Sequence, residues 1–167
     1  MPTEAQEGLT TQVFEIYIRS SAERIWEAIT DPEWNAKYGY RAPMKFDLRP
    51  GGRFSAHPSA EMQAMGLPET MIDGEIIECV PYRRLVQTYR WLFTPQNQAE
   101  GYTRVTWEIE PSNSGFTRLT VIHDELQNAP MMAAAIKSKY DEQGGGGWTL
   151  ILSDLKSLLE TGKTMAE

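Results

Sequence analysis

The feature that most constrains this sequence is one long amphipathic helix at the end of a chain whose other patterns are mostly those of strands. Its apolar residues recur at helical spacing: Trp148, Ile151, Leu152, Leu155, Leu158 and Leu159. Gly162 is a natural stop, because glycine readily takes the left-handed conformation that ends a helix. A helix with one apolar stripe needs an apolar surface to cover it, and one face of a sheet is such a surface.

Period-two alternation predicts the strands of that sheet. The pattern is clearest where Val105, Trp107 and Ile109 alternate with polar neighbours, and on the next strand Leu119, Val121 and His123 share a face. We expect strands over residues 11–19, 44–48, 53–57, 71–80, 85–93, 102–110 and 116–123. The first strand is expected to return and pair within the same sheet. These patterns predict an α+β protein with an antiparallel sheet and one covered face.

Between the first two strands the sequence predicts a pair of helices. Ser20 is a candidate N-cap, with Glu23 completing a capping box, and Asp31-Pro32 ends the first helix. A second helical piece spans residues 33–37, and glycine in Pro50-Gly51-Gly52 supplies the positive φ of a hairpin turn. We expect a loop over residues 58–70, containing Met62 and Met65, and a loose segment over residues 124–143.

Length and composition favour one domain over residues 11–162, with a disordered lead (1–10) and a tail (163–167). The net charge of −7 argues against a nucleic-acid partner, because phosphate binding depends on clustered Lys and Arg. We expect no membrane segment and no signal peptide, and hence a cytoplasmic protein. Cys79 is the only cysteine, so no intramolecular disulfide forms, and we interpret it as an inert core residue.

Six local strings carry a resemblance to a known family. They are Ala28-Ile29-Thr30-Asp31-Pro32-Glu33, Leu48-Arg49-Pro50-Gly51-Gly52-Arg53-Phe54, Gly74-Glu75-Ile76-Ile77-Glu78, Pro81-Tyr82-Arg83-Arg84-Leu85-Val86, Thr117-Arg118-Leu119-Thr120-Val121-Ile122-His123, and Gly147-Trp148 followed by Leu155-Lys156-Ser157-Leu158-Leu159-Glu160. In this order they resemble the START-like, or SRPBCC, superfamily. Within it, the chain is similar to the family homologous to the activator of the heat-shock-protein-90 ATPase.

The resemblance implies a helix-grip fold, in which a curved sheet of about six or seven strands wraps around a long C-terminal helix and leaves a cavity between them. Members commonly bind apolar or amphipathic small molecules there. Some relatives are cyclases or lyase-like enzymes, and eukaryotic members stimulate a chaperone ATPase. An interaction module like the chaperone-ATPase activators is therefore a further alternative. Because those members carry an additional N-terminal domain that engages the chaperone, we do not expect a chaperone partner for this chain. Fold membership alone does not decide function.

Aromatic residues are the first candidates for a ligand site, which is typically apolar with a few placed polar groups. The candidates are Trp34, Tyr38, Phe54, Tyr89, Trp91, Trp107 and Trp148, with His123 as a polar anchor. The same rings are also compatible with a solid core in which they simply pack. The first interpretation is therefore a protein that binds an apolar or amphipathic small molecule.

The alternative is an enzyme of the cyclase or hydratase kind. His123 would serve as its acid or base, because histidine titrates near neutral pH, and Glu75 would be its carboxylate partner. A structural histidine at a sheet edge explains the same position. Because strands alternate, Glu75 and Glu78 are expected on opposite faces, and the sequence leaves open which one points inward.

Other kinds of site find little support in the residues. With only His57 and His123, and no HExxH spacing, we expect no metal and no cofactor. The run Gly144-Gly145-Gly146-Gly147 meets neither phosphate-binding motif, and we interpret it as a hinge before the last helix. Edge strands make a homodimer compatible with the pattern.

Overall fold

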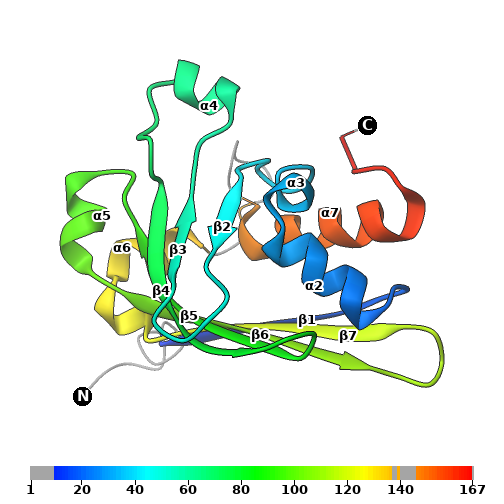
Figure 1. The fold of residues 1–167 in the computed structure, drawn as a ribbon. Helices are drawn as coiled ribbons and strands as arrows, with labels where there is room; N and C mark the ends of the chain where they lie inside the picture. Colours follow the sequence, from blue (N-terminus) through cyan, green and yellow to red (C-terminus); the bar gives the residue numbers. More distant parts are fainter. Residues whose placement is uncertain (1–9, 137–138, 140–145, 167) are drawn as a thin grey trace.

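The computed structural model describes residues 10–136, 139 and 146–166, and Figure 1 shows in them a seven-stranded antiparallel sheet. The strands lie in the spatial order β1-β7-β6-β5-β4-β3-β2. They are β1 Thr11–Ile18, β2 Met44–Phe46, β3 Arg53–Ala56, β4 Ile72–Val80, β5 Arg84–Trp91, β6 Thr103–Pro111 and β7 Thr117–Asp124. The expected return of the first strand is confirmed, because β1 pairs antiparallel with β7 along its whole length.

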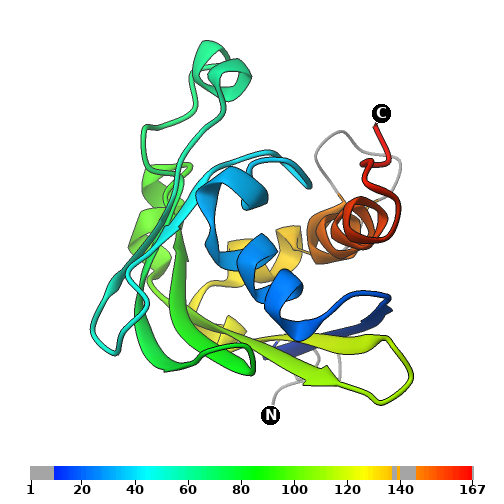
Figure 2. The ribbon, with the colours of Figure 1, turned by 45° about the vertical axis from the view of Figure 1, so that its right-hand side comes forward.

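The two longest described helices, α2 (Ala22–Thr30) and α7 (Gly147–Thr161), lie on the concave side of the sheet, as Figure 2 shows. A curved sheet that wraps around a C-terminal helix is the helix-grip fold, so the predicted α+β fold class is confirmed. The shorter helices are α3 Pro32–Asn35, α4 Ala60–Ala64, α5 Pro95–Glu100, the 3-10 turn η1 Leu126–Asn128 and α6 Pro130–Ala135.

The core forms where the inner faces of β6 and β7 meet α2 and α7. On β6, the predicted alternation holds, since Val105, Trp107 and Ile109 are all buried. The apolar stripe of α7 meets them, and its buried residues in this cluster are Trp148, Leu152, Leu155, Leu158 and Leu159. Fully burying a side chain of this size stabilises the fold by roughly 1.5–3 kcal/mol. Burial of the stripe therefore fixes α7 against the sheet.

The start of α2 differs from the sequence prediction by one residue. Ser21, and not Ser20, is the N-cap, and its hydroxyl accepts a hydrogen bond of 3.2 Å from the backbone N–H of Arg24. The backbone of Ser20 instead continues the turn after β1, donating to the carbonyl of Ile18 at 2.9 Å. Two adjacent serines offer the same capping group, and only the path of the chain after the strand decides between them.

Short helices occupy segments that the sequence analysis left irregular. The loop 58–70 contains α4, the segment 124–143 contains η1 and α6, and α5 follows β5. The helices α4 and α5 begin at side-chain caps, Ser59 and Thr94. With three to six residues each, such helices are too short to show an apolar period. Residues 1–9 of the expected lead, and Gly144 and Gly145 of the expected hinge, lie outside the described residues.

The hairpin between β2 and β3 forms at the predicted glycines. Gly51 has a φ of 84°, in the left-handed region that favours glycine. A Cβ atom on Gly52 would lie 2.0 Å from the carbonyl oxygen of Asp47, so only glycine lets the two strands approach this closely. The close approach sets the pairing of Phe46 with Phe54, whose rings lie on the concave side.

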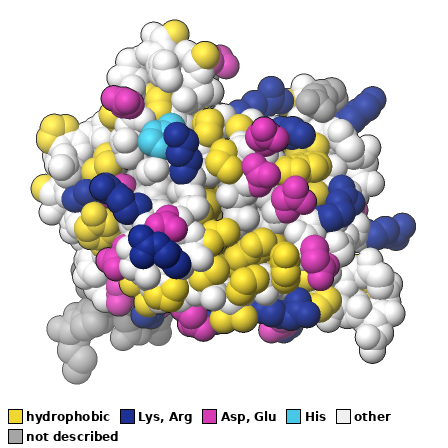
Figure 3. Space-filling model, in the orientation of Figure 1, with side chains coloured by type: hydrophobic (Ala, Val, Ile, Leu, Met, Phe, Trp, Pro, Cys, Tyr) yellow, Lys and Arg dark blue, Asp and Glu magenta, His cyan; other side chains and the backbone are white. Residues whose placement is uncertain are grey.

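The surface mixes charges of both signs. On the face shown in Figure 3, Lys and Arg side chains are interspersed with Asp and Glu around patches of apolar atoms. Among the described residues, no helix has the length and apolar character needed to cross a membrane. In the same part of the chain, no group of three or more His, Cys, Asp or Glu side chains comes together as metal ligands would.

Asn35 generates a testable prediction, because it joins α2, α3 and β2. Its buried amide donates to the carbonyl of Ile29 (3.1 Å) and that of Met44 (2.9 Å), and accepts from the N–H of Met44 (2.8 Å). We expect Asn35→Ala to lower the free energy of unfolding by about 2–4 kcal/mol, because three backbone groups, the carbonyl of the buried Ile29 among them, lose their partner. Urea denaturation measures this change.

The matched control is Asn113→Ala, at an exposed position in the β6–β7 turn. Surface substitutions of this kind usually change stability by less than about 0.5 kcal/mol. Equal effects at Asn35 and Asn113 would contradict the role assigned to the buried amide.

Candidate functional site

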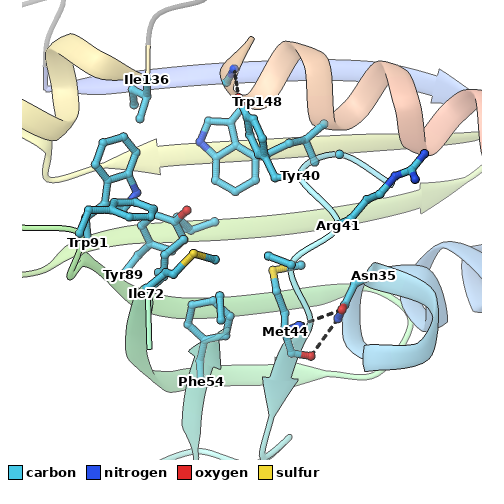
Figure 4. Close-up of a pocket in the computed structure, with 18 of the residues that line it drawn as sticks. Asn35, Tyr40, Arg41, Met44, Phe54, Ile72, Tyr89, Trp91, Ile136 and Trp148 are labelled. Atoms are coloured by element: carbon cyan, nitrogen blue, oxygen red, sulfur yellow. Dashed lines mark hydrogen bonds between the residues drawn. The ribbon is translucent and has the colours of Figure 1, made fainter. Parts of the chain in front are cut away.

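A cavity of about 360 Å³ lies between the concave face of the sheet and the N-terminal end of α7 (Figure 4). Strands β2 to β6 form one wall, and the first turn of α7 and the loop 38–42 form the other. Its lining is mostly apolar, and the size falls within the range of small-molecule sites.

Six of the aromatic residues predicted from the sequence line this cavity: Tyr38, Phe54, Tyr89, Trp91, Trp107 and Trp148. Four of these rings, those of Phe54, Tyr89, Trp148 and Trp107, contact one another in series. The ring of Tyr89 lies 6.0 Å from that of Phe54 and 6.0 Å from that of Trp148, and Trp107 meets Trp148 edge-on at 5.4 Å. Contacts of this kind fix the orientation of each ring, so the wall of the cavity is formed before any ligand arrives.

A few polar groups interrupt the apolar wall. Gln87 is buried and accepts a hydrogen bond of 3.2 Å from Nε1 of Trp107. The buried Nε1 of Trp91 makes no hydrogen bond with any residue that the structure describes, and an unsatisfied buried donor is costly. Burial raises the pKa of Tyr89 to about 12, so this phenol is neutral at ordinary pH. The wall therefore offers neutral polar groups, one of them a donor without a partner.

His123 does not line the cavity but lies behind its aromatic wall. It is completely buried, and the rings of Tyr89 and Trp148 meet it edge-on at 5.2 and 6.0 Å. Its Nδ1 accepts a hydrogen bond of 3.1 Å from Nε1 of Trp148, and its Nε2 lies 2.8 Å from Oγ1 of Thr103. The predicted inward face of β7 is correct, but α7 covers the histidine.

These contacts define the tautomer of His123. The indole N–H of Trp148 can only donate, so Nδ1 must carry no proton. The hydroxyl of Thr103 donates to the carbonyl of Tyr89 at 2.9 Å, and it therefore accepts from Nε2–H. Burial lowers the pKa of His123 to about 4, consistent with a neutral ring. Both nitrogens are occupied within the protein, and this geometry gives no support to the expected acid–base role.

Two further sequence candidates also lie away from the cavity. Glu75 is exposed on β4, and its neighbour Ile76 is the residue that points inward. Strand alternation thus places the carboxylate of Glu75 on the outer face, a direction that the sequence had left open. Trp34 lines a separate surface pocket beside α3, where Nζ of Lys37 lies 4.2 Å from its ring centroid. Asn35 is the buried residue of α3, and its neighbour Trp34 lies on the side of the helix that faces this pocket.

Comparison with known families agrees with this architecture. The family described as "Activator of Hsp90 ATPase homolog 1-like protein" matches residues 19–160, which is most of the chain. The chain belongs to this family. The resemblance noted from the six local strings is thereby confirmed. No curated protein sequence among those compared with the chain matches it.

Solved structures of related proteins share the fold of this family member. CalU16 from Micromonospora echinospora has a TM-score of 0.61 and 20% identity, over 91% of this chain and 77% of its own. A protein from Mesorhizobium loti has a TM-score of 0.64 and 23% identity, over 90% and 96%. An HSP90 activator from Plasmodium falciparum has a TM-score of 0.54 and 20% identity, over 94% and 91%. At these identities the likeness shows the fold alone.

Gln87, Tyr40 and Arg41 are among the lining residues of the cavity that the sequence analysis did not propose. Gln87 carried a usable signal, because it alternates with Leu85 and Tyr89 and so shares their face of β5. Tyr40 and Arg41 carried none. They lie in the loop after α3, whose shape depends on a left-handed turn with φ of 62° at Gly39 and 57° at Arg41.

The buried His123 predicts a specific pH dependence of stability. The ring is neutral in the folded state until the pH reaches about 4, but in the unfolded chain it binds a proton near its ordinary pKa of 6.5. Protonation therefore favours unfolding, and the stability that His123 contributes is complete above 6.5 and lost as the pH falls toward 4. The lost amount should approach about 3 kcal/mol. Urea denaturation over this pH range measures it.

The comparison uses His123→Gln, which lacks the titrating ring but keeps hydrogen-bonding groups. Because both proteins share every other titrating group, the difference between their unfolding free energies isolates the histidine. We expect wild type to exceed the variant at neutral pH and this difference to shrink as the pH falls. A difference that stays constant over the range would show that His123 is not held neutral by burial.

Proposed function

We propose that this protein binds an apolar or amphipathic small molecule in the cavity between the sheet and α7. The observation that carries the proposal is the cavity itself, with a volume of about 360 Å³ and a largely aromatic wall. A domain of this length is able to fill its own core, yet here the rings contact each other and leave a space. A ligand in that space would exchange water for aromatic and aliphatic contacts. Burial of its apolar surface would stabilise the complex by roughly 25 cal/mol for each Å².

The contacts of the wall favour a preformed site over one that a ligand must assemble. Tyr38 at the edge of the cavity is held by a hydrogen bond of 2.9 Å from its hydroxyl to the carbonyl of Ala28. Trp148 is held by its bond to His123, and Trp107 by its bond to Gln87. Rings that are already fixed lose little conformational entropy when a ligand binds, and this raises affinity for a given contact area.

The same geometry favours binding over catalysis. The acid–base pair expected from the sequence, His123 and Glu75, does not meet: one residue is buried behind the wall and the other is exposed on the outer face of β4. The polar groups that β5 presents to the cavity are the phenol of Tyr89, the amide of Gln87 and the indole of Trp91, which are neutral donors and acceptors. Such groups orient a ligand without transferring protons at neutral pH.

A fluorescent apolar probe tests the proposal. N-phenyl-1-naphthylamine is neutral, contains three aromatic rings and becomes bright in apolar surroundings. We expect saturable binding of one probe per chain, with energy transfer from the tryptophans of the cavity wall. Ala42→Trp should weaken binding by about tenfold or more, because an indole added to the lining of the cavity occupies the space of the ligand.

The matched control is Ala99→Trp, which adds the same ring at an exposed position on α5. It should leave the affinity for the probe unchanged. Urea denaturation of both variants separates loss of the site from loss of the fold. Equal affinity of wild type and Ala42→Trp for the probe would place binding elsewhere on the protein and overturn the proposal.

A further inference from the structure

A second pocket adjoins the cavity, and one residue belongs to both. This pocket is lined by Arg24 of α2, by Trp34, Ala36, Lys37 and Arg41 around α3, and by Leu158 and Gly162 at the end of α7. Arg41 also lines the cavity, where it is the one charged residue among the described lining residues. A ligand that fills the cavity therefore reaches a cation at this end.

The second pocket carries three cations and no carboxylate among its described lining residues. Arg24, Lys37 and Arg41 take part in none of the ion pairs that the structure shows between described residues. On strands β5 to β7, by contrast, Arg84, Arg90, Arg104 and Arg118 each face an acidic partner. In a protein with a net charge of −7, three unneutralised cations at one pocket need an explanation.

The end of α7 accounts for these charges only in part. Cations favour a helix C-terminus, where carbonyl groups leave a partial negative charge. Yet the terminal carbonyl of Leu158 accepts from the N–H of Gly162, and the guanidinium of Arg41 donates to the hydroxyl of Thr164 at 3.4 Å. The nearby carboxylate of Asp154 accepts from the backbone N–H groups of Gly39 and Met165, at 2.8 and 2.7 Å. It ties the loop to α7 and forms no ion pair with Arg41.

The backbone holds Arg41 in place at the end of the cavity. Its φ of 57° lies in the left-handed region, which is unusual for a residue other than glycine, and its N–H donates to the carbonyl of Tyr38 at 3.0 Å. Figure 4 shows the side chain of Arg41 at the end of the cavity opposite to Trp91. The cavity thus has an aromatic end and a cationic end.

We infer that the ligand is an amphipathic anion, with its apolar body among the aromatic rings and its acidic group at Arg41, facing Lys37 and Arg24. The inference rests on the proposed function, since it assigns the chemistry of the ligand of that same cavity. A carboxylate, sulfonate or phosphate satisfies it equally, because each presents oxygen atoms that accept from a guanidinium. A cationic ligand is disfavoured, because its charge would meet three like charges.

Two probes with the same body test the inference. The sulfonate 8-anilino-1-naphthalenesulfonate differs from N-phenyl-1-naphthylamine in its acidic group. We expect Arg41→Gln to weaken binding of the sulfonate about fivefold more than it weakens binding of the neutral amine, since a partly exposed ion pair contributes modestly. Lys37→Gln should weaken binding of the sulfonate about twofold, and added salt should weaken binding of the sulfonate but not of the neutral amine.

The control is Arg49→Gln, which removes an exposed arginine of the β2–β3 hairpin that lines neither pocket. Equal weakening of the sulfonate by Arg49→Gln and Arg41→Gln would show a non-specific effect of net charge and overturn the inference. Equal weakening of both probes by Arg41→Gln and by Lys37→Gln would overturn it as well. If the neutral probe binds and neither Arg41→Gln nor Lys37→Gln changes the affinity for the sulfonate, the inferred anion site is wrong while the proposed function stands. If neither probe binds wild type, the proposed function fails first.

Discussion

The hydrogen bond from Trp148 to His123 is the interaction on which the arrangement of the cavity depends. It begins a chain of contacts that runs from α7 through His123 on β7 and Thr103 on β6 to the carbonyl of Tyr89 on β5. Each polar group of this chain of contacts has a hydrogen-bond partner. The network is therefore stable in apolar surroundings, where an unpaired polar group would cost free energy. It fixes the first turn of α7 against the sheet beside the cavity.

The two interpretations of the aromatic residues, a ligand cavity and a solid core, describe two ends of the same helix. Toward the C-terminus of α7, Leu152, Leu155 and Leu159 pack against the sheet and α2 without an intervening space. Toward its N-terminus, Trp148 meets other aromatic rings at their edges. Branched aliphatic side chains fill volume from all sides, whereas flat rings in edge contact leave space between them. The change from leucine to tryptophan along α7 marks the boundary between core and cavity.

Sequence patterns predicted what depends on near neighbours. The alternation of Val105, Trp107 and Ile109 identified the inner face of β6, and six rings of the cavity wall were among the aromatic candidates, for which the family resemblance favoured a cavity. The role of His123 did not follow, because its partners Thr103 and Trp148 lie 20 and 25 residues away and together determine its tautomer and burial. The position of Arg41 depends on a left-handed turn after α3, and no periodic pattern in the sequence predicts such a turn. The placement of Trp34 depends on which side of the four-residue helix α3 is buried.

The net charge of the protein and the local charge at the cavity predict opposite signs for the charge of a ligand. The distance over which charges act in solution decides between them. The chain carries −7 overall, which at long range would repel an anion. At physiological ionic strength, charges farther apart than about 8 Å are largely screened from one another. A ligand whose body lies in the cavity therefore responds to the groups at its mouth, which are Arg41 and, beyond it, Lys37 and Arg24. The acidity of the surface serves solubility, and selection among apolar ligands depends on the single cation that the cavity and the second pocket share.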